Sequence, residues 1–203
     1  MLVEPPPPST VRDIDVLWVS NIQHLKRPDR ILELAGKMPE VKIHMVGGPL
    51  SGQEALFRDI ANKAATTRNV TFHGRLSYWD ANDLYGRAKV LVNTSDVEGF
   101  PNSYVQAWIR GVPVVTLIDP DRVIEREGLG IAARYPAQIP DAVRSLLGDP
   151  AAWNATSDRC HMFMAREYGE EKVLADYFDT FVEVMRIDTT AAGMIVSGEV
   201  RHV

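Results

Sequence analysis

Short apolar segments alternate with amphipathic segments along most of the chain. The apolar segments are apolar almost throughout, as expected for strands buried on both faces. The segments between them carry apolar residues at helical spacing. This alternation is typical of βα units and predicts a parallel sheet covered by helices. The expected strands are residues 16–20, 41–46, 69–74, 89–93, 112–117 and 130–135.

Several of the expected helices begin with a recognisable signal. Pro28 suits the first turn of a helix, and Ser77 with Asp80 three residues later approximates a capping box. A helix is also expected after Pro101, and beyond Arg134 the pattern becomes purely helical. Apart from the helix after Pro101, the expected helices are residues 28–38, 52–65, 77–88, 139–149, 150–168 and 169–186.

The order of these elements predicts an α/β fold, namely a Rossmann-like, doubly wound sheet with the strand order 3-2-1-4-5-6 and helices on both faces. In that topology the chain reverses direction beside the first strand. The loops after the first and fourth strands, residues 19–27 and 94–103, then flank a crevice at the carboxyl edge of the sheet. We expect a ligand to bind there.

The two ends of the chain differ from its middle. Residues 1–13 include four consecutive prolines, which indicate either a stiff interdomain linker or a disordered tail. Residues 14–187 form the expected domain. Residues 188–203 show little periodicity and are expected to be a C-terminal tail.

Composition argues against several classes of function. The net charge is −5 and the basic residues are scattered, so nucleic-acid binding is not expected. No apolar run approaches the roughly 20 residues that span a bilayer. The only cysteine, Cys160, excludes an internal disulfide framework, and the five histidines show no paired ligand spacing. No metal site is therefore expected.

The loop after the fourth strand combines the residue types of an anion-binding turn. Gly99 permits close approach of the backbone, and Pro101 suits a first helical turn. Asn102 and Ser103 would present unpaired backbone N–H groups to a phosphate, or their side chains would only cap the helix. Glu98 would repel a phosphate, so we expect its carboxylate to accept hydrogen bonds from sugar hydroxyls.

Other charged residues allow two interpretations each. Lys26, in the facing loop, could reach a diphosphate or be a solvated surface lysine. If it serves the ligand, it must meet Glu98 across the crevice. Arg75 could border a nucleobase or be a solvated loop arginine. His44 and His73 are expected in the core or at its rim rather than in catalysis.

Three further patterns favour structural roles. The acids of Asp-Pro-Asp, residues 119–121, resemble a metal-binding pair, but a proline directly after a strand favours a turn. Residues 47–52, Gly-Gly-Pro-Leu-Ser-Gly, lack the Lys-Ser/Thr of a phosphate loop and are expected to turn into a helix. The four tryptophans are expected to pack in the core: Trp18, Trp79, Trp108 and Trp153.

Residues 95–115, SDVEGFPNSYVQAWIRGVPVV, resemble the donor-site signature of the group 1 (family 4) glycosyltransferases, which are retaining enzymes of the GT-B architecture. That signature is an acid, seven residues, a second acid, and a small-residue helix end before G-x-P-V-V. Glu98 matches the first acid. Gln106 stands at the second, which in the family typically holds the ribose hydroxyls of the donor. A glutamine can hydrogen-bond ribose but carries no charge.

Residues 16–35 are similar to the first strand and loop of the same family, where G-R-L-x-x-x-K-G grips the diphosphate. Lys26 matches the lysine, while Ser20 and Asn21 stand where the glycine and arginine usually are. Loss of that arginine removes a bidentate phosphate contact. The resemblance extends from Val16 to about Met185.

The resemblance implies that this chain is half of a GT-B fold, the C-terminal, donor-binding domain of a hexosyltransferase-type enzyme. The sugar would pass from a UDP- or GDP-linked donor to a glycan or lipid-linked acceptor without a metal or other cofactor. Catalytic roles would fall to Glu98 and Lys26. The donor-binding residues would be Ser20, Asn21, Arg75, Gly99, Phe100, Pro101, Asn102, Ser103 and Gln106.

The implied partner is an N-terminal acceptor-binding domain of the same full-length protein, without which the chain is expected to be inactive. The implied location is the cytoplasm, with peripheral association of the full-length enzyme at the inner face of the membrane as a further expectation. Two alternatives stay open: a sugar-nucleotide epimerase domain, and a non-catalytic nucleotide-sugar-binding module, suggested by Asn21 and Gln106.

Overall fold

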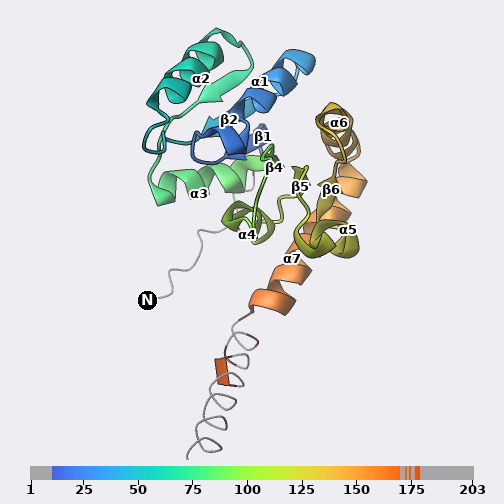
Figure 1. Ribbon diagram of the computed structural model, residues 1–203. Coiled ribbons are helices and arrows are strands. Elements are labelled where there is room, and N and C mark those ends of the chain that lie inside the picture. Colours follow the sequence, from blue (N-terminus) through green and yellow to red (C-terminus); the bar gives the residue numbers. More distant parts are fainter. Residues whose placement is uncertain (1–10, 170–171, 173, 175–176, 179–203) are drawn as a thin grey trace, which may run out of the picture. The chain divides into compact units, whose positions relative to one another are not determined.

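A computed structural model, which describes residues 11–169, 172, 174, 177 and 178, contains a six-stranded parallel sheet. Its strand order is β3-β2-β1-β4-β5-β6, so the predicted topology is confirmed (Figure 1). The strands are β1 (Ile14–Val19), β2 (Ile43–Val46), β3 (Val70–Phe72), β4 (Ala88–Asn93), β5 (Val114–Thr116) and β6 (Gly130–Ala132).

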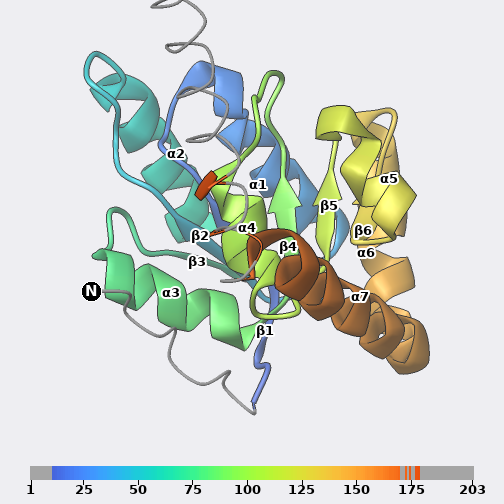
Figure 2. The ribbon, with the colours of Figure 1, turned by 90° about the horizontal axis from the view of Figure 1, so that it is seen from below.

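The helices lie on both faces of the sheet (Figures 1 and 2). They are α1 (Pro28–Lys37), α2 (Glu54–Thr66), α3 (Tyr78–Arg87), α4 (Asn102–Trp108), α5 (Val123–Glu127), α6 (Ile139–Gly148) and α7 (Pro150–Tyr168). Three short 3₁₀ helices are η1 (His24–Lys26), η2 (Pro120–Arg122) and η3 (Pro136–Gln138). The sequence did not predict α5, and most of the expected helix 169–186 lies outside the described residues.

The hydrophobic core lies between the sheet and the helices α1, α2 and α6. Alternate strand residues such as Val16, Trp18 and Met45 pack there with Ile31 of α1 and Val143 of α6. Burying each such side chain contributes about 1.5–3 kcal/mol. Helix α3 packs against β1, β4 and α4. These contacts join α3 to the two strands whose following loops flank the crevice.

Helix α4 is held to the sheet by two aromatic residues that are fully buried. The hydroxyl of Tyr104 lies 2.6 Å from Thr116 Oγ1 and donates to the main-chain oxygen of Ile118 over 3.0 Å. The indole of Trp108 donates to the main-chain oxygen of Leu129. Each buried polar tip therefore has a partner, and the start of α4 is anchored at the end of β5.

The prediction of core packing was wrong for one tryptophan. Trp18 and Trp108 are buried, and Trp153 donates its indole N–H to Lys89 O over 2.8 Å. Trp79 is 54% exposed. It occupies the first turn of α3, where its ring contacts only Tyr78 among the aromatic residues that the structure describes. The helical pattern placed the residue in α3 without showing which side faces the sheet.

The two motifs with structural interpretations behave as turns. Both carboxylate oxygens of Asp119 accept backbone N–H groups at the start of α5, from Ile124 at 2.8 Å and Glu125 at 3.0 Å. Asp119 is thus a helix cap. A side-chain carbon on Gly47 would overlap the main-chain oxygen of Ser20, so the first glycine of the Gly-Gly pair permits two loops to touch. Within the described part of the chain, no cluster of three or more His, Cys, Asp or Glu side chains could hold a metal.

The chain divides into two units, Met1–Phe163 and Met164–Val203, and the whole sheet belongs to the first. The predicted boundaries at residues 13/14 and 187/188 stay predictions. No helix among the described residues combines the length and apolar character that crossing a membrane requires.

Candidate functional site

The loops after β1 and β4 are joined at the carboxyl edge of the sheet. The backbone N–H of Asp96 donates to Leu25 O over 2.8 Å. The hydroxyl of Thr94 accepts from the indole of Trp18 at 2.9 Å and lies 2.9 and 3.0 Å from the main-chain oxygens of Lys26 and Arg27. These bonds make the two loops a single unit.

Helix α1 binds the loop after β4 through charged side chains. Arg30 donates to Thr94 O over 2.9 Å and forms an ion pair with Asp96 at 2.6 Å. Arg27 lies 3.4 Å from the same carboxylate. The loop after β4 is therefore held at its backbone and at a side chain before any ligand arrives.

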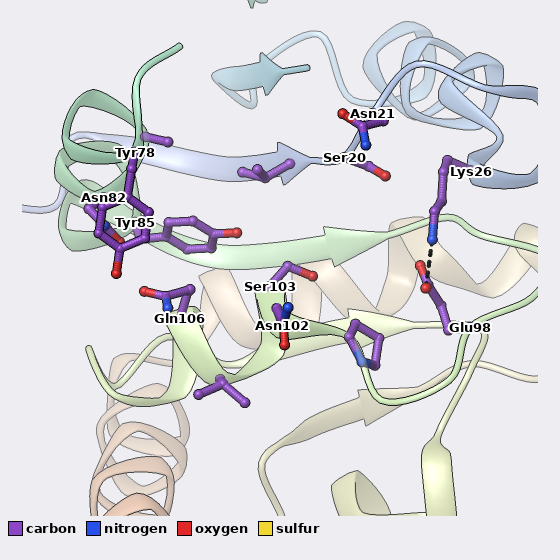
Figure 3. A pocket seen from close by; sticks show the side chains of 14 residues that line it. Ser20, Asn21, Lys26, Tyr78, Asn82, Tyr85, Glu98, Asn102, Ser103 and Gln106 are labelled. Carbon is purple, nitrogen blue, oxygen red and sulfur yellow. Dashed lines mark hydrogen bonds and ion pairs between the residues drawn. The ribbon is translucent and has the colours of Figure 1, made fainter. Parts of the chain in front are cut away.

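Lys26 and Glu98 meet across the crevice between these loops (Figure 3). Lys26 Nζ lies 2.6 Å from Glu98 Oε2, and the two side chains are 19% and 11% exposed. The other carboxylate oxygen accepts from Ser95 Oγ at 2.7 Å and Asn93 Nδ2 at 3.1 Å. The carboxylate therefore has donors on both oxygens.

These donors decide the charge of Glu98. Burial by itself raises the pKa of the carboxyl, but hydrogen bonds from Lys26, Ser95 and Asn93 outweigh burial and hold the pKa below its ordinary value of 4.5. The carboxylate is thus ionised at neutral pH. An ionised carboxylate can accept hydrogen bonds from hydroxyl groups and cannot donate one.

A cavity of about 580 Å³ opens beside this pair. Its volume falls in the range of small-molecule sites. It is lined by Val19, Ser20, Asn21, Lys26, Tyr78, Ala81, Asn82, Tyr85, Glu98, Pro101, Asn102, Ser103, Val105 and Gln106. Lys26 and Glu98 lie at one end, and Gln106 lies at the other (Figure 3).

Most of the predicted donor-binding residues line the cavity, and three do not. Arg75 donates to Pro49 O over 3.0 Å and so holds the loop after β2. The rings of Phe100 and Trp108 form an edge-to-face pair with centroids 6.1 Å apart, and Phe100 is 42% exposed. Gly99 lies next to Phe100, with open space where a side chain would project. The predicted roles of these three residues in ligand binding stay predictions.

Asn102 and Ser103 form the first turn of α4 and face the cavity. The helix has no side-chain cap, because Pro101 occupies the capping position. Within the described part of the chain, neither side chain makes a hydrogen bond. Both side chains are therefore available to a ligand, and the capping alternative is not observed.

Comparison with known proteins decides the family. Residues 13–149 match the family model described as glycosyl transferases group 1. The chain belongs to the group 1 glycosyltransferases. A curated relative, the D-inositol 3-phosphate glycosyltransferase of Mycobacterium tuberculosis, is 36% identical over 140 residues, which are 65% of this chain and 29% of the relative. The chain thus spans less than a third of the length of the curated relatives it matches.

Solved glycosyltransferases share the fold over most of this chain. Sucrose-phosphate synthase from Thermosynechococcus elongatus superposes with a TM-score of 0.72 at 17% identity, covering 87% of this chain and 47% of its own. A mutant of TarM from S. aureus, solved with UDP, fondaparinux and alpha-GlcNAc-glycerol, superposes with 0.69 at 23% identity, covering 86% and 36%. The fold is therefore half of a GT-B fold.

Sequence reasoning missed one wall of the cavity in this group 1 glycosyltransferase domain. Tyr78, Asn82 and Tyr85 of α3 all line it. They are spaced four and three residues apart, so they share one face of the helix. The available signal was the repeat of polar or hydroxyl-bearing residues at this helical spacing, on a face other than the one that carries the apolar Leu84. The pattern was used only to predict the helix.

Proposed function

We propose that this chain is the donor-binding domain of a retaining, hexosyltransferase-type glycosyltransferase. It holds a nucleotide diphosphate sugar in the cavity at the carboxyl edge, and the sugar passes to a glycan or lipid-linked acceptor. The observation that carries the proposal is the Lys26–Glu98 contact, which places a cation and an ionised acid side by side in one pocket.

Among the described residues that line the cavity, Lys26 is the one cation. A diphosphate is the strongest anion that the ligand offers, so it is assigned to the end of the cavity near Lys26. Asn102 and Ser103 donate to its oxygens from the first turn of α4. When the bond between the sugar and the diphosphate breaks, negative charge grows on the leaving oxygen, and Lys26 stabilises that charge.

Glu98 takes the sugar rather than the phosphate. As Lys26 turns to the diphosphate, Glu98 Oε2 loses its partner, while Ser95 and Asn93 still hold Oε1. The freed oxygen accepts hydrogen bonds from sugar hydroxyls. The carboxylate is thereby oriented before the donor binds, which lowers the entropic cost of binding.

The relatives support this assignment without deciding the acceptor. The matched TarM and Anabaena HepE structures were solved with UDP, the latter also with glucose. The curated relatives are much longer than this chain. We therefore place the acceptor contacts in an N-terminal domain of the same full-length protein, in the cytoplasm or at the inner face of the membrane. The isolated chain should bind donor without transferring the sugar.

Calorimetric titration with UDP, GDP and their glucose conjugates tests the proposal. We expect at least one of these nucleotides to bind at micromolar to millimolar concentration. A hydrogen bond to a charged group contributes about 1.5–3 kcal/mol, so Lys26→Met should weaken that binding about tenfold to a hundredfold. The matched control Lys63→Met, on the exposed side of α2, should change nothing. Absence of binding by all four ligands at millimolar concentration would refute the proposal.

The two alternatives predict different outcomes. A sugar-nucleotide epimerase would incorporate solvent deuterium at a sugar carbon, whereas a transferase would not. A non-catalytic module would bind donor but support no transfer even within the full-length protein. Transfer by the full-length protein that is lost in Glu98→Gln, without deuterium incorporation, would exclude both.

A further inference from the structure

The cavity end opposite Lys26 and Glu98 is lined by polar side chains of α3 and α4 (Figure 3). Asn82 and Tyr85 are 3% and 4% exposed, and both border the cavity. Neither side chain makes a hydrogen bond to any residue that the structure describes. Neither residue has a polar side-chain atom that is both buried and unpaired, so these atoms open onto the cavity. This end therefore presents polar groups that a ligand can bind.

Gln106 completes this end and is held by an unusual neighbour. Arg110 is 4% exposed, and its Nη1 donates to both the main-chain oxygen and the Oε1 of Gln106, at 2.9 and 3.0 Å. A guanidinium has donors and no acceptor. The amide of Gln106 must therefore turn its oxygen toward Arg110.

No acidic side chain among the described residues lies within ion-pair distance of Arg110. The amide oxygen of Gln106 is thus a main partner of a buried charge, and turning it away would leave that charge with less compensation. The Nε2 of Gln106 makes no hydrogen bond within the described part of the chain, and the residue borders the cavity. At this position Gln106 therefore presents the two N–H donors of its Nε2 to the cavity.

We propose that Arg110 is a positioning residue that makes Gln106 a fixed hydrogen-bond donor to the ribose of the bound nucleotide. The ribose hydroxyl oxygen then acts as the acceptor. This inference rests on the proposed function, because it assumes that the diphosphate lies between Lys26 and the first turn of α4. A carboxylate at position 106 would reverse the hydrogen bond, since it can only accept.

The spacing along α4 selects the ribose. Gln106 follows Ser103 by three residues, so the two share one side of the helix about one turn apart. A helical turn advances about 5.4 Å. A ribose follows directly on its phosphate, whereas the base lies farther away. A phosphate bound near Ser103 therefore brings the ribose beside Gln106.

Methylated nucleotides test the direction of this hydrogen bond. The 2′-O-methyl and 3′-O-methyl derivatives of UDP keep the oxygen and lose the hydrogen. We expect the wild-type chain to bind at least one of them within about threefold of UDP. In Gln106→Glu the same methylation should lower the affinity about tenfold, because a carboxylate can only accept and the methylated oxygen has no hydrogen to donate. Glutamine and glutamate are alike in size, so steric effects of the methyl group cancel.

Arg110→Met tests the positioning role. Without the guanidinium the amide can rotate and accept from the hydroxyl, so the affinity ratio of methylated to unmethylated UDP should move toward that of Gln106→Glu. A merely structural role would weaken both ligands equally and leave the ratio unchanged. Arg126→Met, which is exposed, is the matched control.

Three outcomes separate the claims. If the affinity ratio of methylated to unmethylated UDP is the same in the wild type and in Gln106→Glu, the inference is overturned while donor binding stays intact. A tenfold loss of affinity on methylation in the wild-type chain also overturns the inference and leaves donor binding intact. Failure of the wild-type chain to bind UDP, GDP or their conjugates overturns the proposed function itself, and the inference with it.

Discussion

The carboxylate of Glu98 is oriented by three side chains from its own and the facing loop. Ser95 and Asn93 lie three and five residues before it and bind one oxygen, while Lys26 binds the other. The hydrogen bonds from Ser95 and Asn93 form within the loop after β4. The contact with Lys26 forms only because the fold brings the loop after β1 beside it. If Lys26 turned away, Ser95 and Asn93 would still hold the other carboxylate oxygen in place.

Glu98→Gln should lower the free energy of unfolding by about 1–3 kcal/mol at pH 7, since hydrogen bonds to a charged group are lost. The folded pKa of Glu98 is depressed, so its contribution is fully present above its ordinary pKa of 4.5 and is lost as pH falls through the lower folded value. Urea unfolding at pH 7 and pH 3 measures this. The variant should differ from the wild type at pH 7 and less at pH 3.

The control for that measurement is Glu33→Gln, an exposed residue of α1. It should change stability by less than about 0.5 kcal/mol at either pH. A difference between Glu98→Gln and the wild type that is equal at both pH values would show that its effect does not come from the charge.

At the scale of elements, the site depends on contacts between loops that follow different strands. Ser20 N–H donates to Val46 O, and Ile22 N–H donates to Gly48 O, at 3.0 and 2.8 Å. The loop after β2 thereby supports the loop that carries Asn21. Gly47 is needed for this close approach, whereas a side-chain carbon on Gly48 would meet the side chain of Arg75. Neither glycine lines the cavity.

Gly47→Ala should destabilise the chain by about 1–3 kcal/mol, because a side-chain carbon there overlaps the main-chain oxygen of Ser20. It should also weaken UDP binding by shifting the loop after β1. Gly36→Ala is the matched control: it lies exposed within α1 with nothing near the new carbon, so stability should rise by about 0.5–1 kcal/mol. Thermal unfolding and UDP titration check both. An unchanged Tm in Gly47→Ala would show that the new side-chain carbon does not clash with the main-chain oxygen of Ser20.

Thr94→Val should lower stability by about 1–3 kcal/mol. The substitution keeps the shape of the side chain but leaves the buried indole N–H of Trp18 without an acceptor. It also breaks the hydroxyl's link to η1. Thr71→Val, on the exposed side of β3, is the control and should be nearly neutral. Urea unfolding measures both, and equal effects would show that the hydroxyl of Thr94 does not join the loops.

At the scale of the whole molecule, the cavity lies at the switch in strand order beside β1, and titratable groups elsewhere influence how stability depends on pH. His73 Nε2 lies 3.1 Å from His44 Nδ1 at the β2–β3 edge of the sheet, outside the cavity. Burial lowers the pKa of both imidazoles. The charge of Arg87 lowers both further, and His73 itself lowers that of His44.

The histidine pair predicts that stability falls as pH drops below about 6.5. Both folded pKa values lie below their ordinary value of 6.5, so the unfolded chain binds more protons in that window. Asp13, which favours the charged form of His44, opposes the effect, and Lys42 adds to it. His73→Gln should reduce the slope of stability between pH 7 and pH 5. An unchanged slope in His73→Gln would refute the assignment.

Much of the site followed from order along the chain. The βα rhythm predicted the strand order, and the strand order predicted which two loops meet. Lys26 and Glu98 were found in this way, although their roles stay predictions. Trp79 and the α3 wall were not, because a helical pattern with polar residues on both sides does not show which side faces the sheet.

The sequence by itself determined the sheet, its switch point and the loop residues beside it, because strand periodicity and parallel connection rules are local. Only the tertiary structure decided which hydrogen-bond partners the polar side chains have. Asp119 caps α5, Arg75 holds a neighbouring loop, and Arg110 fixes the amide of Gln106. Each outcome depends on which groups the packing of distant elements brings within hydrogen-bond reach, and that distance is not encoded in spacing along the chain.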